Sequence, residues 1–193
     1  MSKIYKVSDS IKTTKKQSLV IKKLLEDIQT GDATKIAAAL KLLQVNGDIT
    51  VLRPLAELLM TDIVETSKYE IISFLGDLKV SAAADEIMDL IKDEQLLPVR
   101  QALLTSIWNS KVDYSYFIAD FVEIACEGDF MEALECLTII ENMEGPFQEQ
   151  HILEAQLHLK DYIEDDAPKD PQRAHILSEI AVLIKDFDLG IDD

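Results

Sequence analysis

The residues with the clearest metal-ligating chemistry are His151, Glu154 and His158, which follow one another at spacings of three and four residues. On a helix this spacing puts two imidazoles and a carboxylate on one face, and these are groups that bind Zn²⁺. The two histidines are nevertheless two helical turns apart, about 10.5 Å, which is too far to share one ion on a straight helix. We therefore predict no metal site and no bound cofactor.

Two other sets of residues resemble sites but have simpler explanations. Cys126 and Cys136 are expected on adjacent helices, but no Lys, Arg or His lies nearby in sequence to stabilise a thiolate. We interpret them as small buried hydrophobes. The alternating acids Asp186, Asp188 and Asp192 resemble a calcium loop, but Gly190 comes one position early and no bidentate Glu follows. We interpret this stretch as an acidic tail.

Enzymatic motifs are absent from the sequence. It has no glycine-rich phosphate loop, no nucleophile elbow and no H-E-x-x-H, and it has only 3 His. Carboxylates are numerous, and the region 112–166 contains many of them with few cations. One alternative therefore stays open, an acidic-site enzyme or a divalent-cation-binding protein that uses carboxylates of 112–166, while our main hypothesis is a protein without catalytic activity.

Four acids occupy the same place in a recurring pattern of apolar, any, acid, apolar, apolar; they are Glu57, Asp89, Asp120 and Asp161. If the four segments are stacked helices, these carboxylates form a row at about 8–10 Å spacing, in which like charges repel mildly. Glu123 and Glu127 share a helical stripe with Asp120 and widen the row. The row is either a solubilising face or the binding face for a basic partner.

Aromatic residues concentrate between Trp108 and Phe121. Trp and Tyr are favoured anchors at protein interfaces, which makes Trp108, Tyr114 and Tyr116 candidate partner-binding residues. Core packing is the competing interpretation, because Phe117 and Phe121 follow helical spacing.

The elements that position these residues are helices joined by short turns. Only 6 Gly and 5 Pro are present, too few for a fold of many short strands. Apolar periodicity predicts ten helices, at 17–29, 33–45, 49–61, 66–77, 80–93, 97–109, 114–127, 129–142, 146–164 and 171–187.

The helices repeat with a period just above thirty residues. Apolar pairs recur at Leu40 and Leu43, at Ile72 and Leu75, at Leu104 and Ile107, and at Leu137 and Ile140. Such a period indicates a repeat architecture of about four helix pairs. The stretch from Pro98 to Leu103 resembles the V-R-x-A opening of a HEAT repeat, and Leu75-Gly76-Asp77 resembles the L-G-D turn of that family. Lys68 and Glu132 stand where the family pattern has Arg. The resemblance implies an α-solenoid scaffold that holds partners on a curved face.

Charge narrows the choice of partner. The formal net charge is −17, so nucleic acid and anionic membrane would be repelled. Residues 1–30 have the opposite sign of charge, because they contain seven lysines and three acids. Within them, residues 1–16 are predicted to form a polar, basic arm. We expect a cytoplasmic protein, because the start lacks a signal-peptide pattern and the cysteines form no disulfide framework.

These observations predict one all-α domain over 17–193, a short right-handed HEAT-like superhelix of about four antiparallel pairs with an N-terminal helix and a C-terminal cap helix. The predicted function is a non-catalytic protein-interaction scaffold whose acidic face binds a basic or mixed basic-apolar protein or peptide. Self-association through residues 1–30 is a further alternative.

Overall fold

The computed structural model describes residues 15–78, 82–108 and 110–190, and the predicted arm at 1–16 lies almost wholly outside this range. The described residues form helices and no strand, as predicted. The ten α-helices are α1 (Lys15–Gln29), α2 (Ala33–Asn46), α3 (Leu52–Leu59), α4 (Glu65–Gly76), α5 (Ala82–Lys92), α6 (Arg100–Ile107), α7 (Ile118–Glu127), α8 (Phe130–Glu141), α9 (Glu149–Glu164) and α10 (Pro171–Leu189). Short 3-10 turns precede α3, α6 and α7, at Ile49–Val51, Glu94–Val99 and Ser115–Phe117.

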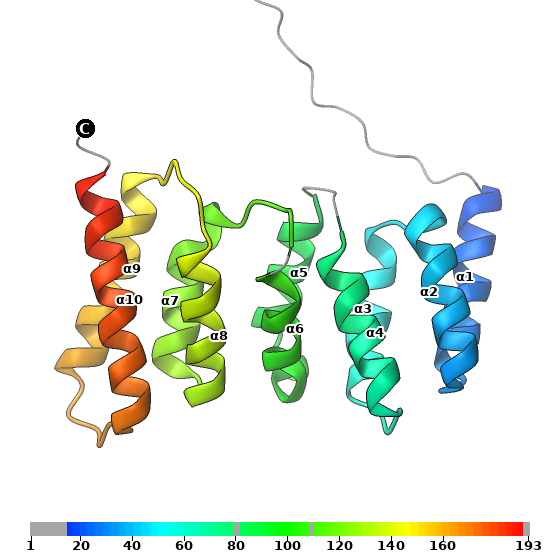
Figure 1. Cartoon of the computed structure of the whole chain (residues 1–193), viewed down its shortest axis with the longest axis horizontal. Coiled ribbons are helices and arrows are strands. Elements are labelled where there is room, and N and C mark those ends of the chain that lie inside the picture. The colour runs from blue at the N-terminus through cyan, green and yellow to red at the C-terminus, as the bar shows by residue number, and fades with distance from the viewer. Residues whose placement is uncertain (1–14, 79–81, 109, 191–193) are drawn as a thin grey trace, which may run out of the picture.

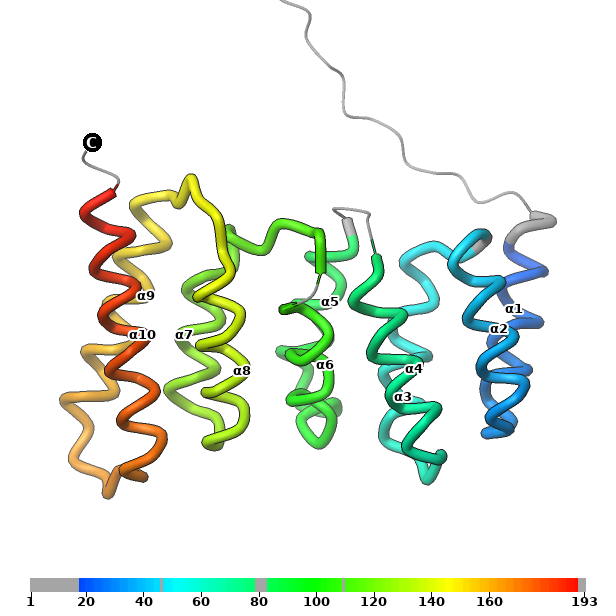
Figure 2. Tube along the Cα trace, viewed as in Figure 1, coloured from blue at the N-terminus to red at the C-terminus, as the bar shows by residue number. Residues whose placement is uncertain are grey.

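The helices stand side by side as antiparallel hairpins along the long axis of the molecule (Figure 1). The consecutive helices that pack on each other are α1 with α2, α3 with α4, α5 with α6, α7 with α8, and α9 with α10. Figure 2 traces the same progression from one end to the other. Five hairpins therefore replace the four pairs and two single helices expected from the sequence. A repeat period has no phase, so the sequence alone could not show which helix begins each pair.

Two rows of helices run through this arrangement. The even-numbered helices α2, α4, α6, α8 and α10 each contact the next in their row, and α3 with α5 and α7 with α9 do so in the odd-numbered row. The apolar pairs of the repeat lie between the rows, where Leu43, Leu75, Leu104 and Ile140 are buried. The periodicity thus correctly predicted the inward faces. In the acid-containing pattern, by contrast, the last apolar position of the Asp161 segment, Ile163 in the last turn of α9, is exposed.

Aspartates begin several of these helices. The side chains of Asp32, Asp93, Asp129 and Asp170 each accept a hydrogen bond from a backbone N–H in the first turn of the element that follows. Such capping satisfies donors that have no partner inside the helix. Part of the acidic excess is therefore structural.

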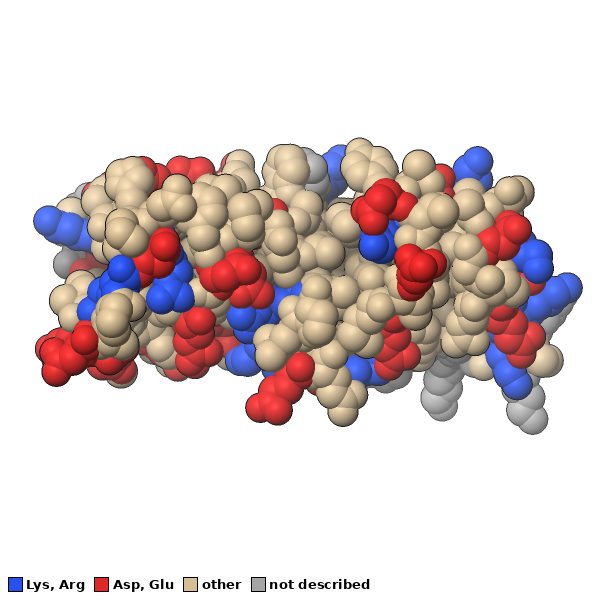
Figure 3. Space-filling view, turned by 90° about the horizontal axis from the view of Figure 1, so that it is seen from below, with Lys and Arg blue, Asp and Glu red and all other residues tan. Residues whose placement is uncertain are grey.

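Neighbouring hairpins are joined by ion pairs as well as by apolar contacts. Arg100 on α6 binds Glu132 on α8, and Arg53 on α3 binds Asp93 after α5 at 2.9 Å. Seen from below, Lys and Arg side chains lie among the Asp and Glu side chains, with broad uncharged areas between them (Figure 3). This edge is consequently mixed in charge. No helix among the described residues is both long enough and apolar enough to cross a membrane.

Candidate functional site

The acids of the recurring pattern all lie in the odd-numbered row of helices. Glu57, Asp89 and Asp161 are exposed on α3, α5 and α9, and Asp120 is half-buried on α7. Glu123 and Glu127 follow on α7, the former half-buried and the latter exposed. These carboxylates thus lie on helices of one row.

A lysine interrupts this row. The Lys92 ammonium on α5 donates a hydrogen bond to Asp120 on α7. That bond, together with the nearby charges of Asp120, Glu123 and Asp89, raises the pKa of Lys92, although partial burial opposes the shift. Asp120 therefore faces a cation as well as the like charges of the row, because the last turn of α5 brings Lys92 to the neighbouring hairpin.

The aromatic candidates separate into buried and exposed residues. Tyr114 is 5% exposed, and its ring packs near Phe117 and edge-on to Phe121, so it belongs to the core and cannot be a surface anchor. Trp108 and Tyr116 are 43% and 59% exposed. Tyr116 already contacts the His151 ring, with centroids 4.3 Å apart. Trp108 therefore remains as the candidate anchor without an aromatic contact in the part of the chain that the structure describes.

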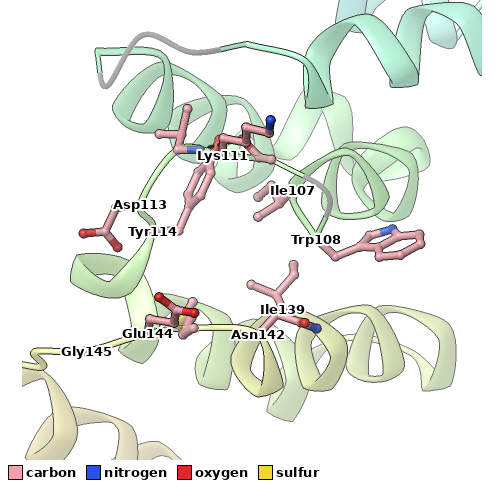
Figure 4. Close-up of a pocket in the computed structure, with 12 residues that line it drawn as sticks. Ile107, Trp108, Lys111, Asp113, Tyr114, Ile139, Asn142, Glu144 and Gly145 are labelled. Atoms are coloured by element: carbon pink, nitrogen blue, oxygen red, sulfur yellow. Dashed lines mark hydrogen bonds between the residues drawn. The ribbon is translucent and has the colours of Figure 1, made fainter.

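Trp108 stands at the rim of a cleft of about 380 Å³ between two connections on the same edge of the molecule (Figure 4). One connection leads from α6 to α7 and contributes residues 108 and 110–114, and the other follows α8 and contributes residues 142–145. The buried side chains of Ile107, Tyr114 and Ile139 line it, with the half-buried Val112 and Met143 beside them. The polar surface exposed in the cleft is nevertheless larger than the apolar surface, so these side chains form only an apolar part of it, which accepts one or two apolar side chains of a partner.

Acidic groups lie at one end of the cleft, and the exposed Lys111 also lines it. Asp113 and Glu144 lie at this end on the two connections, with the Asp113 carboxylate directed outward, and the Trp108 ring projects outward at the other end (Figure 4). Both carboxylates are exposed, and Asp113 also accepts a hydrogen bond from the Ser115 N–H at 2.9 Å. Within the described residues, Glu144 and the exposed Lys111 have no side-chain hydrogen bond or ion pair. The cleft thus has an acidic end and an aromatic end.

The residues considered for metal or thiol chemistry do not form a site. His151 is buried against Tyr116, and no group of three or more His, Cys, Asp or Glu side chains arranged to hold a metal ion occurs among the described residues. Burial raises the pKa of the Cys126 thiol to about 11 and raises that of Cys136 further. Both thiols are therefore protonated at neutral pH, which agrees with their interpretation as small hydrophobes.

The second wall of the cleft was not identified from the sequence. The predicted helices at 129–142 and 146–164 leave Met143, Glu144 and Gly145 as a connection with no assigned role, because irregular backbone carries no periodic signal. One signal could have predicted this wall. Helices one repeat apart, such as α6 and α8, run parallel to each other, so the connections that follow them leave from the same end and lie next to each other.

No protein-family model, curated protein or solved structure matches this chain.

Proposed function

We propose that this chain is a non-catalytic protein-binding module, a HEAT-like α-solenoid, that holds a basic, partly apolar segment of another protein in the cleft between 108–114 and 142–145. The observation that carries the proposal is the occurrence, in one cleft, of several apolar side chains and Trp108 together with two exposed carboxylates. A partner segment with an apolar side chain beside a Lys or Arg complements both ends.

The physical division of roles supports this assignment. The apolar side chain of the partner leaves water on binding and supplies most of the affinity. Trp is among the residues that most often contribute a large share of the binding energy at an interface. Asp113 and Glu144 attract the cation and determine which segments enter, an effect that weakens as salt is added. The carboxylates of the odd-numbered row, Glu57, Asp89, Asp120, Glu123, Glu127 and Asp161, would steer the same partner at longer range.

The test uses Trp108, which is the only tryptophan of the chain and therefore reports on the cleft through its fluorescence. The probe is a labelled twelve-residue peptide with one central Leu flanked by Lys. Two matched peptides replace either the Leu with Ser or the Lys with Glu. We expect the first peptide to bind with a change in Trp108 emission, and each matched peptide to bind at least tenfold more weakly.

Matched variants locate the site. Asp113→Asn with Glu144→Lys keeps a hydrogen-bond acceptor at 113 and removes the acidic end; it should weaken binding about tenfold or more. Asp62→Asn with Asp166→Lys makes the same change of charge at exposed turn positions on the opposite edge and should change binding by less than twofold. Equal losses in both variants, or loss only when Asp89 and Glu123 are changed to Lys, would overturn the assignment to the cleft.

A further inference from the structure

We propose that the cleft has an occupant within the same chain: the stretch Lys3-Ile4-Tyr5-Lys6 enters it intramolecularly and competes with the partner. This inference rests on the proposed function, because it assigns a regulatory ligand to the same cleft. It concerns a segment outside the described residues, and the argument is drawn from the chemistry of that segment and from the described cleft and helix α1.

The stretch has the chemistry that the cleft selects. Two apolar side chains, Ile4 and Tyr5, stand between two lysines. The cleft offers apolar side chains, with Asp113 and Glu144 at one end and Trp108 at the other. In a chain of net charge −17, basic segments are scarce, and residues 1–30 with a net charge of +4 are the most basic part of the sequence. Charge complementarity therefore favours this segment over the rest of the chain.

The geometry allows the contact within one molecule. Helix α1 begins at Lys15 on the edge of the molecule where the connections after α6 and α8 also lie (Figure 1). The cleft is two to three hairpins away, and packed helices are about 8–10 Å apart, so the span is roughly 20–30 Å. Eleven residues separate Ile4 from Lys15, and an extended chain covers about 3.3–3.6 Å per residue, or ~36–40 Å. Ile4 and Tyr5 can reach the cleft, whereas Ile11 cannot.

Intramolecular attachment makes a weak contact effective. A short tether holds its ligand at an effective concentration of about 1 mM. If the isolated stretch had a dissociation constant of ~0.1 mM, the cleft would be occupied about 90% of the time, and a competing partner would bind about tenfold more weakly.

The test keeps the chain at full length. Lys3→Glu with Lys6→Glu should release the cleft, so that the Leu-Lys probe peptide binds about tenfold more tightly and Trp108 emission in the absence of peptide shifts toward that of an exposed indole. The control is Lys22→Glu with Lys23→Glu, an equal change of charge at exposed positions of α1, which should leave the affinity for the probe within twofold. A synthetic peptide of residues 1–14 should bind the released variant and displace the probe.

Three outcomes overturn the inference. Equal affinity for the probe in the wild-type chain and the released variant would remove the stretch as occupant and leave the proposed function intact. Release by the Lys22 and Lys23 changes as well would show that net charge alone acts. If the Trp108 emission of the wild-type chain changes on hundredfold dilution, the stretch would be binding to the cleft of a second copy of the chain. Failure of the probe to bind any variant would instead refute the proposed function, and the Trp108 shift would then test the inference alone.

Discussion

Arg100 and Glu132, which are 32 residues apart, form a two-pronged ion pair between α6 and α8. The Arg100 Nε and Nη2 atoms donate to the two carboxylate oxygens of Glu132, each at 2.7 Å. Glu132 Oε2 also accepts from the Asp129 N–H at 3.0 Å, and the Asp129 side chain accepts from the Glu132 N–H, which completes a capping box. One carboxylate thereby fixes both the start of α8 and its attachment to the preceding hairpin. The bond to Glu132, followed by a smaller direct effect of its charge, raises the pKa of Arg100.

Replacing one partner of this pair should be costly. The two side chains are only 15% and 12% exposed, so Arg100→Met leaves a largely buried carboxylate without its cation, and we expect a loss of about 3 kcal/mol in the free energy of unfolding measured in urea. The double change Arg100→Met with Glu132→Met should cost less than either single change. Glu164→Gln, which breaks the exposed pair with Lys160, serves as control and should cost less than about 0.5 kcal/mol.

Gly76 allows α4 and α6 to approach closely. A Cβ at this position would lie 2.8 Å from the carbonyl oxygen of Ser106, and a backbone atom cannot move aside as a flexible side chain can. We expect Gly76→Ala to destabilise the chain by about 1–3 kcal/mol in thermal or urea unfolding. Gly190→Ala, at a helix end where the nearest atom would be 3.5 Å away, is the control, and an equal loss there would contradict the explanation.

The helices and their buried faces could be predicted because they depend on local periodicity. Leu55, Ile87 and Ile118 are buried as their repeat positions implied. The L-G-D motif was correctly located at the end of a helix, but the reason for its glycine, contact with Ser106 on the next even-numbered helix, depends on three-dimensional packing. The phase of the hairpins was not predictable for a similar reason, since it depends on which neighbour packs more closely.

The candidate site was only partly predictable. Composition drew attention to Trp108 and Tyr114 alike and could not show that Trp108 is exposed and Tyr114 is buried, because both residues lie in irregular backbone where spacing does not indicate a face. The wall formed by Glu144 was missed, since it comes from a connection about thirty residues away. The pairing of Lys92 with Asp120 was missed because it joins different hairpins.

Charge reversal at Asp120 tests that pairing. Repulsion among row carboxylates alone would make Asp120→Lys neutral or slightly stabilising. The structure predicts the opposite sign, because the change removes the partner of Lys92 and places a second cation beside it. We expect a loss of up to about 1 kcal/mol, limited by the exposure of Lys92. Asp161→Lys, at an exposed position of α9 in the same row, is the control and should lie within about 0.5 kcal/mol of the wild-type chain in the same urea titration.

The alkaline titration of Tyr114 tests its burial in the cleft wall. Burial raises the pKa of Tyr114 from 10.0 to about 12, although a hydrogen bond with Ser110 opposes the shift. Because the unfolded chain ionises at the lower pH, the stabilisation from keeping this phenol neutral is fully present below pH 10 and is lost as the pH rises to about 12, with a change on the order of 2 kcal/mol. Tyr114→Phe should flatten this part of the stability profile and remove the latest phenolate absorbance step. Tyr69→Phe, at a site 74% exposed, should leave both unchanged.

The Cys126 thiol, whose pKa rises from 9.0 to about 11, adds a separate loss of stability at lower pH. The wild-type chain and both variants share this loss, so the difference between them isolates the contribution of Tyr114. A Tyr114 phenol that ionises near pH 10 in the folded chain would show that this wall of the cleft is open to water.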